Sequence, residues 1–210
     1  MQLNLPHLVP LMNARTVLIV GMGGGFDIFC GLPIRHALRE TGKTVHLANL
    51  SFTDLKFIKE AVTLAPGVVG VHADCRSVLQ YVPELHLARY LRDSENDAAP
   101  IWCFGGDSEL AARPLLRAYE AVIDHLKPDV LLLIDGGVDS LMRGDEAELG
   151  TIFEDAVSLA AVSQLPAAIP RYLACLGMGA ENDITYAHVL ENIAALAGSG
   201  GFLGTCSLTR

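Results

Sequence analysis

The chain has 210 residues, of which 51% are hydrophobic and 19% are charged. This length and composition exclude a disordered protein and indicate a single α/β domain over residues 1–210 that buries its own core. The 24 acidic and 15 basic residues give a formal net charge of −9, which argues against nucleic acid as a partner. The basic residues form no dense run, so an anionic membrane surface is not expected either.

The apolar runs are too short to span a membrane, since a spanning helix needs about 20 apolar residues. The longest runs are Val17–Val20 and Val130–Ile134, and both fit buried strands. The first residues carry no basic leader and no clear cleavage site, so they do not resemble a secretory signal. The 5 cysteines are widely spaced and form no CxxC pair, which suits free thiols better than disulfides or a zinc site. We therefore expect a cytoplasmic protein without zinc.

Segments typical of strands alternate with segments typical of helices from Thr16 onward. The expected strands are residues 16–21, 43–52, 67–73, 100–106, 129–135, 170–177 and 200–206, the third of which could instead be an extended segment. The expected helices are residues 28–40, 54–62, 108–126, 152–164 and 184–198. Residues 76–99 look least regular, and residues 136–150 read as a long loop. This alternation predicts an α/β fold with an open, doubly wound, mostly parallel sheet of Rossmann or flavodoxin type, covered by helices on both faces.

A glycine-rich turn, Gly21–Asp27 (GMGGGFD), follows the first expected strand. Such a turn lets a ligand approach the backbone closely and favours an anion or a phosphate at the start of the next helix. The residues expected to bind it are Gly23, Gly24 and Gly25. Phe26 stands where a dinucleotide fingerprint has its third glycine, and no GK[ST] follows, so NAD is not expected. Asp27 either stabilises the helix start or directs a carboxylate at a sugar hydroxyl, an amine or a metal.

A carboxylate-rich segment follows the expected strand at residues 129–135. Ligands of open α/β sheets bind beyond the carboxyl ends of the strands, and neighbouring carboxylates can hold Mg²⁺ or shift one another's pKa for acid–base work. We assign catalytic roles to Asp135, Asp139 and Asp27, metal ligation to Asp139 and Asp145, and ligand binding to Gly137, Ser140 and Arg143. The alternatives are a solvated acidic turn at Asp145 and Glu146, and a helix capping box at Thr151 and Glu154, the latter followed by Asp155.

A third polar segment, Gly177–Asp183, follows the expected strand at residues 170–177. Glu181 and Asn182 could bind ligand in the same crevice, whereas Asp183 is expected to cap the next helix. Cys103–Asp107 is a fourth candidate strand end. The histidines show no HxH or HExxH spacing and no GxSxG motif occurs, so neither a histidine metal site nor an α/β-hydrolase is predicted.

The turn at Gly21–Asp27 together with the segment Asp135–Leu159 (DGGVDSLMRGDEAELGTIFEDAVSL) resembles the domain of unknown function 1152 family, with weaker support from Glu181–Ile184. The second motif is long and specific, whereas the first would be weak alone. The resemblance implies an α/β fold and carries over no activity. It also implies that relatives continue beyond Arg210, so a further C-terminal segment is an open alternative.

These features favour an enzyme, a hydrolase or transferase rather than a redox enzyme, that acts on a small phosphorylated or nucleoside-like metabolite. Mg²⁺ is the cofactor that the carboxylates would suit, and the ligand is expected to be anionic. Two alternatives remain open. One is a non-catalytic ligand-binding or sensory domain, because folds of this kind host both; the other is a subunit of a larger assembly, including a homo-oligomer.

Overall fold

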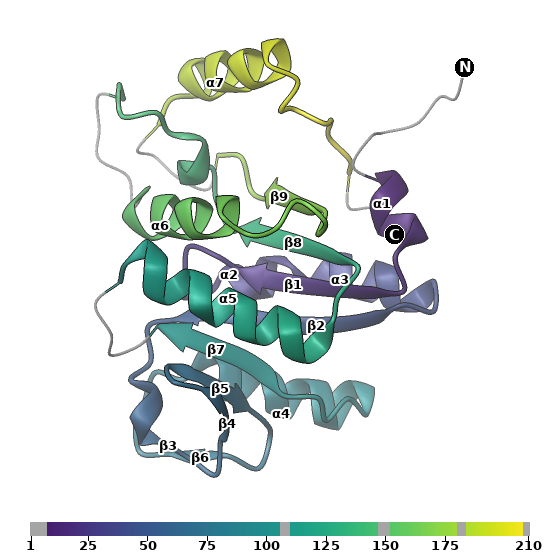
Figure 1. Ribbon diagram of the computed structural model, residues 1–210, viewed down its shortest axis with the longest axis vertical. Helices are drawn as coiled ribbons and strands as arrows, with labels where there is room; N and C mark the ends of the chain where they lie inside the picture. Colours follow the sequence, from purple (N-terminus) through teal and green to yellow (C-terminus); the bar gives the residue numbers. More distant parts are fainter. Residues whose placement is uncertain (1–7, 106–109, 147–151, 180–183, 208–210) are drawn as a thin grey trace.

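The computed structural model describes residues 8–105, 110–146, 152–179 and 184–207. Its centre is a 7-stranded sheet with the strand order β4-β5-β7-β2-β1-β8-β9, whose strands run across the middle of Figure 1 with helices in front of them and behind them. The strands of this sheet are β1 (Thr16–Gly21), β2 (Thr44–Ser51), β4 (Val62–Ala65), β5 (Val68–Val71), β7 (Ile101–Gly105), β8 (Val130–Asp135) and β9 (Arg171–Cys175). A separate 2-stranded ribbon pairs β3 (Ile58–Lys59) with β6 (Arg76–Ser77).

Strands β7, β2, β1, β8 and β9 run parallel, while β5 and β4 form an antiparallel edge. The predicted open, doubly wound, mostly parallel α/β sheet is therefore confirmed. The chain moves from β1 outward through β2 to β7 and then crosses to the other side of β1 to form β8. This reversal creates a topological switch point between β1 and β8, which is where such sheets bind ligands.

Helices cover both faces of the sheet, because successive side chains of a buried strand point in opposite directions. Val17 and Ile19 pack on one side, with α2, α3 and α4, and Leu18 and Val20 pack on the other, with α5 and α6. A third, small cluster of Val138, Ile184 and Val189 joins α7 to the loop after β8. The helices are α1 (Leu8–Asn13), α2 (Asp27–Cys30), α3 (Leu32–Glu40), α4 (Pro83–Glu95), α5 (Ala112–Leu126), α6 (Ile152–Ser163) and α7 (Tyr186–Gly198), with 3-10 turns η1 (Leu55–Phe57) and η2 (Asp139–Leu141).

Two predictions between β2 and β7 are wrong. The helix expected over residues 54–62 is the turn η1 followed by short strands, because Glu60 adopts a left-handed backbone with φ 64 that a helix cannot contain. Residues 76–99, expected to be irregular, contain the 13-residue helix α4. Pro83 opens α4, a position that proline favours.

Smaller corrections concern the first and last parts of the chain. The helix expected over residues 28–40 is divided at Gly31, where a Cβ would lie 2.9 Å from the side chain of Ile19, so the backbone rests directly on the sheet. The last expected strand, residues 200–206, is irregular. Within the described parts of the chain, no helix is both long enough and apolar enough to cross a membrane.

Candidate functional site

The candidate site lies at the carboxyl ends of β1 and β8, the switch point of the sheet. Gly21 ends β1 beside Ile134, and Asp135 is the last residue of β8. The chain turns after β1 through the glycine-rich loop and enters α2 at Asp27. Both strand ends thus bring a carboxylate to the same edge, as the sequence predicts.

Three buried aspartates form what we call the inner cluster: Asp135 on β8, Asp139 on η2 and Asp155 on α6. Each offers a carboxylate oxygen that lies within 4.8 Å of those of the other two. Asp27 lies beside this cluster, because a Cβ at Gly23 would be 2.8 Å from carboxylate oxygens of both Asp27 and Asp155. Of these four aspartates, only Asp155 is absent from the residues to which we assign a role from the sequence.

Asp155 is the least satisfied member of the inner cluster. Asp155 is only 3% exposed, and its buried Oδ1 atom accepts no hydrogen bond. A buried carboxylate oxygen without a partner is costly, so such groups usually serve a ligand or carry a proton. No Lys or Arg of the described residues forms an ion pair with Asp27, Asp135 or Asp155.

The crowding of carboxylates in a buried space changes their proton affinity. Burial, followed by the negative charges of Asp139 and Asp135, raises the pKa of Asp155 to about 9. Burial also raises the pKa of Asp27 to about 7, although hydrogen bonds from two backbone N–H groups oppose this shift. The pKa of Asp135 is raised by burial as well. Burial of these carboxylates beside one another therefore favours their protonated forms.

Asp135 is fixed by the loop that follows it. Its Oδ1 accepts the N–H of Gly137 at 2.7 Å, and its Oδ2 accepts both the N–H of Ser140, at 3.2 Å, and the Ser140 hydroxyl. The Ser140 Oγ also lies 3.2 Å from the Cys175 Sγ. Gly137 and Ser140, expected to bind ligand, thus hold Asp135 in position.

The glycine-rich loop is shaped by the aspartates and by one aromatic ring. The N–H of Gly23 donates to Oδ2 of Asp27 at 2.7 Å, and the N–H of Gly136 donates to the other oxygen at 3.1 Å. Gly24 has a φ of 95, and a Cβ there would lie 2.5 Å from the ring of Phe52. The Gly23 N–H that we expect to bind an anion is therefore already used within the protein. Because Gly23 and Gly24 have no side chains, the carboxylates of Asp27 and Asp155 and the ring of Phe52 can approach the backbone of the loop closely.

A second group, which we call the outer cluster, consists of Asp145, Glu146 and His188. The His188 Nε2 lies 3.1 Å from Asp145 Oδ1, at the protein surface. Desolvation raises the pKa of Glu146, but hydrogen bonds, beginning with those from the N–H groups of Arg143 and Gly144, outweigh it and lower the pKa to about 2. Asp139 and Asp145, which we pair as metal ligands from the sequence, belong to different clusters.

The remaining residues that the sequence predicts to bind ligand or to cap helices lie at the surface or outside the described residues. Arg143 lies on the exposed turn beside the outer cluster. Glu181 and Asn182 lie outside the described residues, as do residues 106 and 107 of the fourth strand end and Thr151 of the expected capping box. Asp183, expected to cap this helix, also lies outside the described residues, and the N-cap of α7 is Thr185, whose side chain accepts the N–H of His188.

Sequence reasoning missed two sets of residues at this edge. Asp155 sits in the first turn of α6, where a carboxylate is common for helix stability alone, so no local pattern marks it as a site residue. Ser158, three residues later and also buried, donates to the Met22 carbonyl at 2.7 Å. The second set, Asn49 and Glu84, holds the glycine-rich loop in place through hydrogen bonds. The Asn49 side-chain amide donates to the carbonyl of Gly25 and to the fully buried carboxylate of Glu84.

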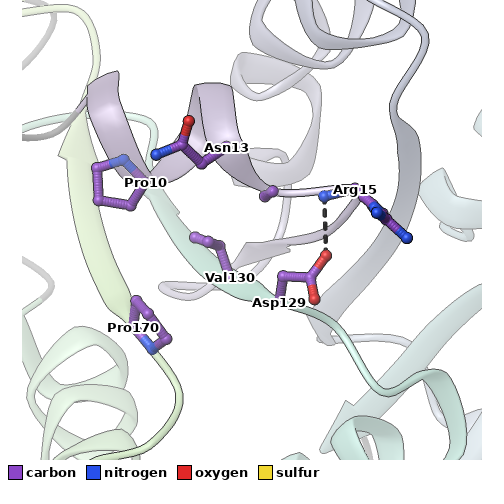
Figure 2. Close-up of a pocket in the computed structure, with 7 residues that line it drawn as sticks. Pro10, Asn13, Arg15, Asp129, Val130 and Pro170 are labelled. Carbon is purple, nitrogen blue, oxygen red and sulfur yellow. Dashed lines mark hydrogen bonds between the residues drawn. The ribbon is translucent and has the colours of Figure 1, made fainter.

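A separate hollow lies at the opposite edge of the sheet. It has a volume of about 430 Å³ and is lined by α1, the start of β1 and the segments that enter β8 and β9. Figure 2 shows its one carboxylate, Asp129, bonded to the backbone N–H of Arg15; the same oxygen accepts the N–H of Thr16. The Asp129 carboxylate thus holds the backbone at the start of β1, and the candidate site remains the switch point, where several buried carboxylates meet.

The fold and site define a doubly wound α/β protein with a buried carboxylate cluster at the switch point of its sheet. The chain belongs to the family described as "Protein of unknown function (DUF1152)", whose pattern matches residues 52–210. The match includes the whole inner cluster and excludes the glycine-rich loop with Asp27. No curated protein and no solved structure matches the chain significantly.

Proposed function

We propose that the protein is a divalent-cation-dependent enzyme, a hydrolase or transferase, that acts on a small phosphorylated or nucleoside-like metabolite at the inner cluster. One observation carries the proposal: the buried Oδ1 of Asp155 lacks a hydrogen-bond partner within a set of three carboxylates whose oxygens lie within 4.8 Å of one another. Oxygen ligands in such a set suit Mg²⁺, which binds one or two protein carboxylates and keeps coordination positions for water and a phosphate. An anionic substrate would then be bound through the metal rather than by backbone N–H groups.

In this proposal the inner cluster binds the cation and Asp27 transfers a proton. Asp135, Asp139 and Asp155 would hold the cation, and the hydrogen bonds from Gly137 and Ser140 keep the first of these carboxylates oriented. Asp27 faces Asp155 across Gly23 and would accept the proton of an attacking water or hydroxyl group. When bound, Mg²⁺ would neutralise charge on the transferring group and orient it.

Titration with Mn²⁺, followed by calorimetry or electron paramagnetic resonance, tests the metal site directly. We expect binding that Asp155→Asn and Asp139→Asn each weaken at least about tenfold, as loss of a charged ligand does. Asp124→Asn is the matched control, because this carboxylate is 79% exposed near the end of α5, where it pairs with Lys127 and is not part of the inner cluster. Absence of Mn²⁺ binding, or binding that Asp155→Asn leaves unchanged, would contradict the proposal.

Turnover separates the enzyme from the alternative of a binding or sensory domain. Phosphorylated metabolites would first be screened by thermal shift with and without Mg²⁺, since a ligand at a hundred times its Kd adds about 2.7 kcal/mol to stability. Compounds that stabilise the protein in a Mg²⁺-dependent manner would then be assayed for phosphate release or group transfer. Stabilisation without any chemical change in the ligand would favour the non-catalytic alternative.

A further inference from the structure

Three aromatic side chains lie exposed around the glycine-rich loop, and the proposed function leaves them unused. Phe26 precedes α2, Phe52 follows β2 directly, and Tyr81 lies just before α4. Their exposed fractions are 62%, 53% and 41%. Grouped exposed rings at a ligand-binding edge are uncommon unless they contact something, because burying such surface is favourable.

The three rings are held together by specific contacts. The Phe26 and Tyr81 rings meet edge to face, with centroids 5.7 Å apart. The ring of Phe52 lies against Gly24, where any side chain would collide with it, and a Cβ at Gly25 would be 3.4 Å from both Phe52 and the Tyr81 hydroxyl. The rings of Phe52 and Tyr81 therefore lie against the glycine-rich loop, which they can approach because Gly24 and Gly25 have no side chains, and Phe26 joins them through Tyr81.

The backbone beneath the rings is also fixed. Thr53, only 2% exposed, donates its hydroxyl hydrogen to the Tyr81 carbonyl at 3.1 Å. Its N–H donates to the Ser51 hydroxyl at 3.1 Å. The segments that carry Phe52 and Tyr81 are thus tied to each other, so the rings are presented at defined positions and pay little ordering entropy on binding.

The rings and the carboxylates meet at adjacent residues. Gly23 touches the carboxylates of Asp27 and Asp155, and Gly24 touches Phe52. Consecutive Cα atoms are about 3.8 Å apart, so adjacent residues of one short loop lie beside the exposed ring of Phe52 and beside the carboxylates of Asp27 and Asp155. A nucleoside phosphate has the matching arrangement, with a planar base at one end and an anionic group at the other.

We propose that Phe26, Phe52 and Tyr81 form a stacking subsite for the planar base of a nucleoside-type substrate whose sugar or phosphate end reaches the inner cluster. This inference rests on the proposed function and narrows its substrate class. Aromatic side chains stack on any base because each base has a π face. The subsite therefore selects for the presence of a base, while the choice among bases depends on other contacts.

Calorimetric titration of the full chain with Mg²⁺ tests the subsite. The probes are adenosine, guanosine, cytidine and uridine 5′-monophosphates, each compared with ribose 5-phosphate, which lacks the base. We expect at least one nucleotide to bind about tenfold or more tightly than ribose 5-phosphate, in the range of stacking on an aromatic side chain. If none of the four binds more tightly than ribose 5-phosphate, the inference is wrong.

Ring-removing variants connect that preference to the residues. Phe52→Leu and Phe26→Leu should each reduce the advantage of the nucleotide at least about fivefold and leave the affinity for ribose 5-phosphate unchanged. Phe57→Leu is the control, since Phe57 is an exposed ring, 45% accessible, on the neighbouring turn η1. Phe26 is the more exposed of the two rings, so its replacement tests the subsite even if Phe52→Leu folds poorly. A preference that neither variant alters would overturn the assignment.

A parallel Mn²⁺ titration keeps the two proposals apart. Mn²⁺ binding without any preference for nucleotides over ribose 5-phosphate would contradict the stacking subsite but remain consistent with the proposed function. A base preference that depends on Phe26 and Phe52 without Mn²⁺ binding would contradict the metal-dependent enzyme and leave a base-binding surface. An affinity of the rings for a protein partner, seen as self-association or as nucleotide-independent binding, would also count against the subsite.

Discussion

The inner and outer clusters contain similar ligand groups but differ in burial, in the direction of their pKa shifts and in hydrogen bonding. Each gathers three potential ligand groups whose atoms lie within 4.8 Å of one another. In the inner cluster the carboxylates are buried, the pKa of Asp155 is raised, and its Oδ1 has no partner. In the outer cluster the pKa of Glu146 is lowered, because its carboxylate already accepts several N–H groups. Unmet hydrogen-bonding capacity, rather than the number of acidic residues, distinguishes a ligand site from a stabilised turn.

The largest effect should follow from adding one methyl group at the inner cluster. In Gly23→Ala the new Cβ would lie 2.8 Å from carboxylate oxygens of Asp27 and Asp155, so these groups must move apart. We expect Mn²⁺ affinity to fall at least about tenfold and stability to fall by about 1–3 kcal/mol, as for other overpacked sites. Titration and chemical denaturation measure the two effects.

Gly198→Ala is the matched control for this change. A Cβ at Gly198, at the end of α7, meets no atom within 4 Å. Alanine is favoured over glycine in a helix, so this variant should be neutral or slightly more stable and should bind Mn²⁺ normally. Equal losses in both variants would mean that the space around Gly23 has no special role.

The second effect is a pH dependence that belongs to the inner cluster alone. The pKa of Asp155 is about 9 in the folded protein, whereas its ordinary value is 3.8, so between these pH values the folded state binds one more proton than the unfolded state. This group's contribution to the free energy of unfolding is therefore full below pH 4 and declines as the pH rises toward 9. In Asp155→Asn this decline is absent.

Denaturation of both proteins in EDTA, at several pH values, measures this difference. The stability of Asp155→Asn relative to the original protein should increase from pH 4 to pH 9, on the order of 1–3 kcal/mol in total. Adding Mg²⁺ should reverse the order at pH 8, because a bound cation stabilises the ionised carboxylates. A relative stability that stays constant with pH would show that Asp155 is ionised without strain.

The sequence could predict the parts of this arrangement that depend on strand ends. Asp27 and Asp135 follow from the rule that parallel strands deliver their carboxyl ends to one edge, and that rule needs no side-chain detail. Asp155 reaches the same place from a helix, by a packing of α6 that no local pattern specifies. Asp145 was paired with Asp139 because the two are close along the chain, whereas the turn after η2 carries Asp145 to α7 instead.

For the fold as well, the sequence predicts features that depend on neighbouring residues but not features that depend on distant partners. The parallel strands were predictable from continuous apolar runs such as Val130–Ile134, because both faces of these strands are buried. Helix α4 carried readable signals, with Pro83 at its start and buried Leu87 and Leu91 at a spacing of four, but its polar last turn resembled a loop. The antiparallel direction of β5 depends on its partner β7 and could not be predicted from its own residues.

The third effect concerns the outer cluster and should leave the metal site untouched. Glu146→Gln removes a charged acceptor from the N–H groups of Arg143 and Gly144, and changes the contact with the Asn192 amide. Because a carboxylate accepts these hydrogen bonds better than an amide, the melting temperature should fall and Mn²⁺ affinity should remain the same. Loss of Mn²⁺ binding in this variant would transfer the metal site to the outer cluster.

The smallest effect is expected from Asp145→Asn. Asp145 is 63% exposed and pairs with His188 at the surface, where solvent screens the charges and an ion pair contributes little. Stability at neutral pH should change by less than about 0.5 kcal/mol, and Mn²⁺ affinity should not change. The variant is informative because the sequence alone ranks Asp145 with Asp139 as a metal ligand. If Asp145→Asn weakens Mn²⁺ binding as strongly as Asp139→Asn, then exposure and hydrogen-bond satisfaction do not distinguish the two clusters, and the inner cluster loses its claim to be the site.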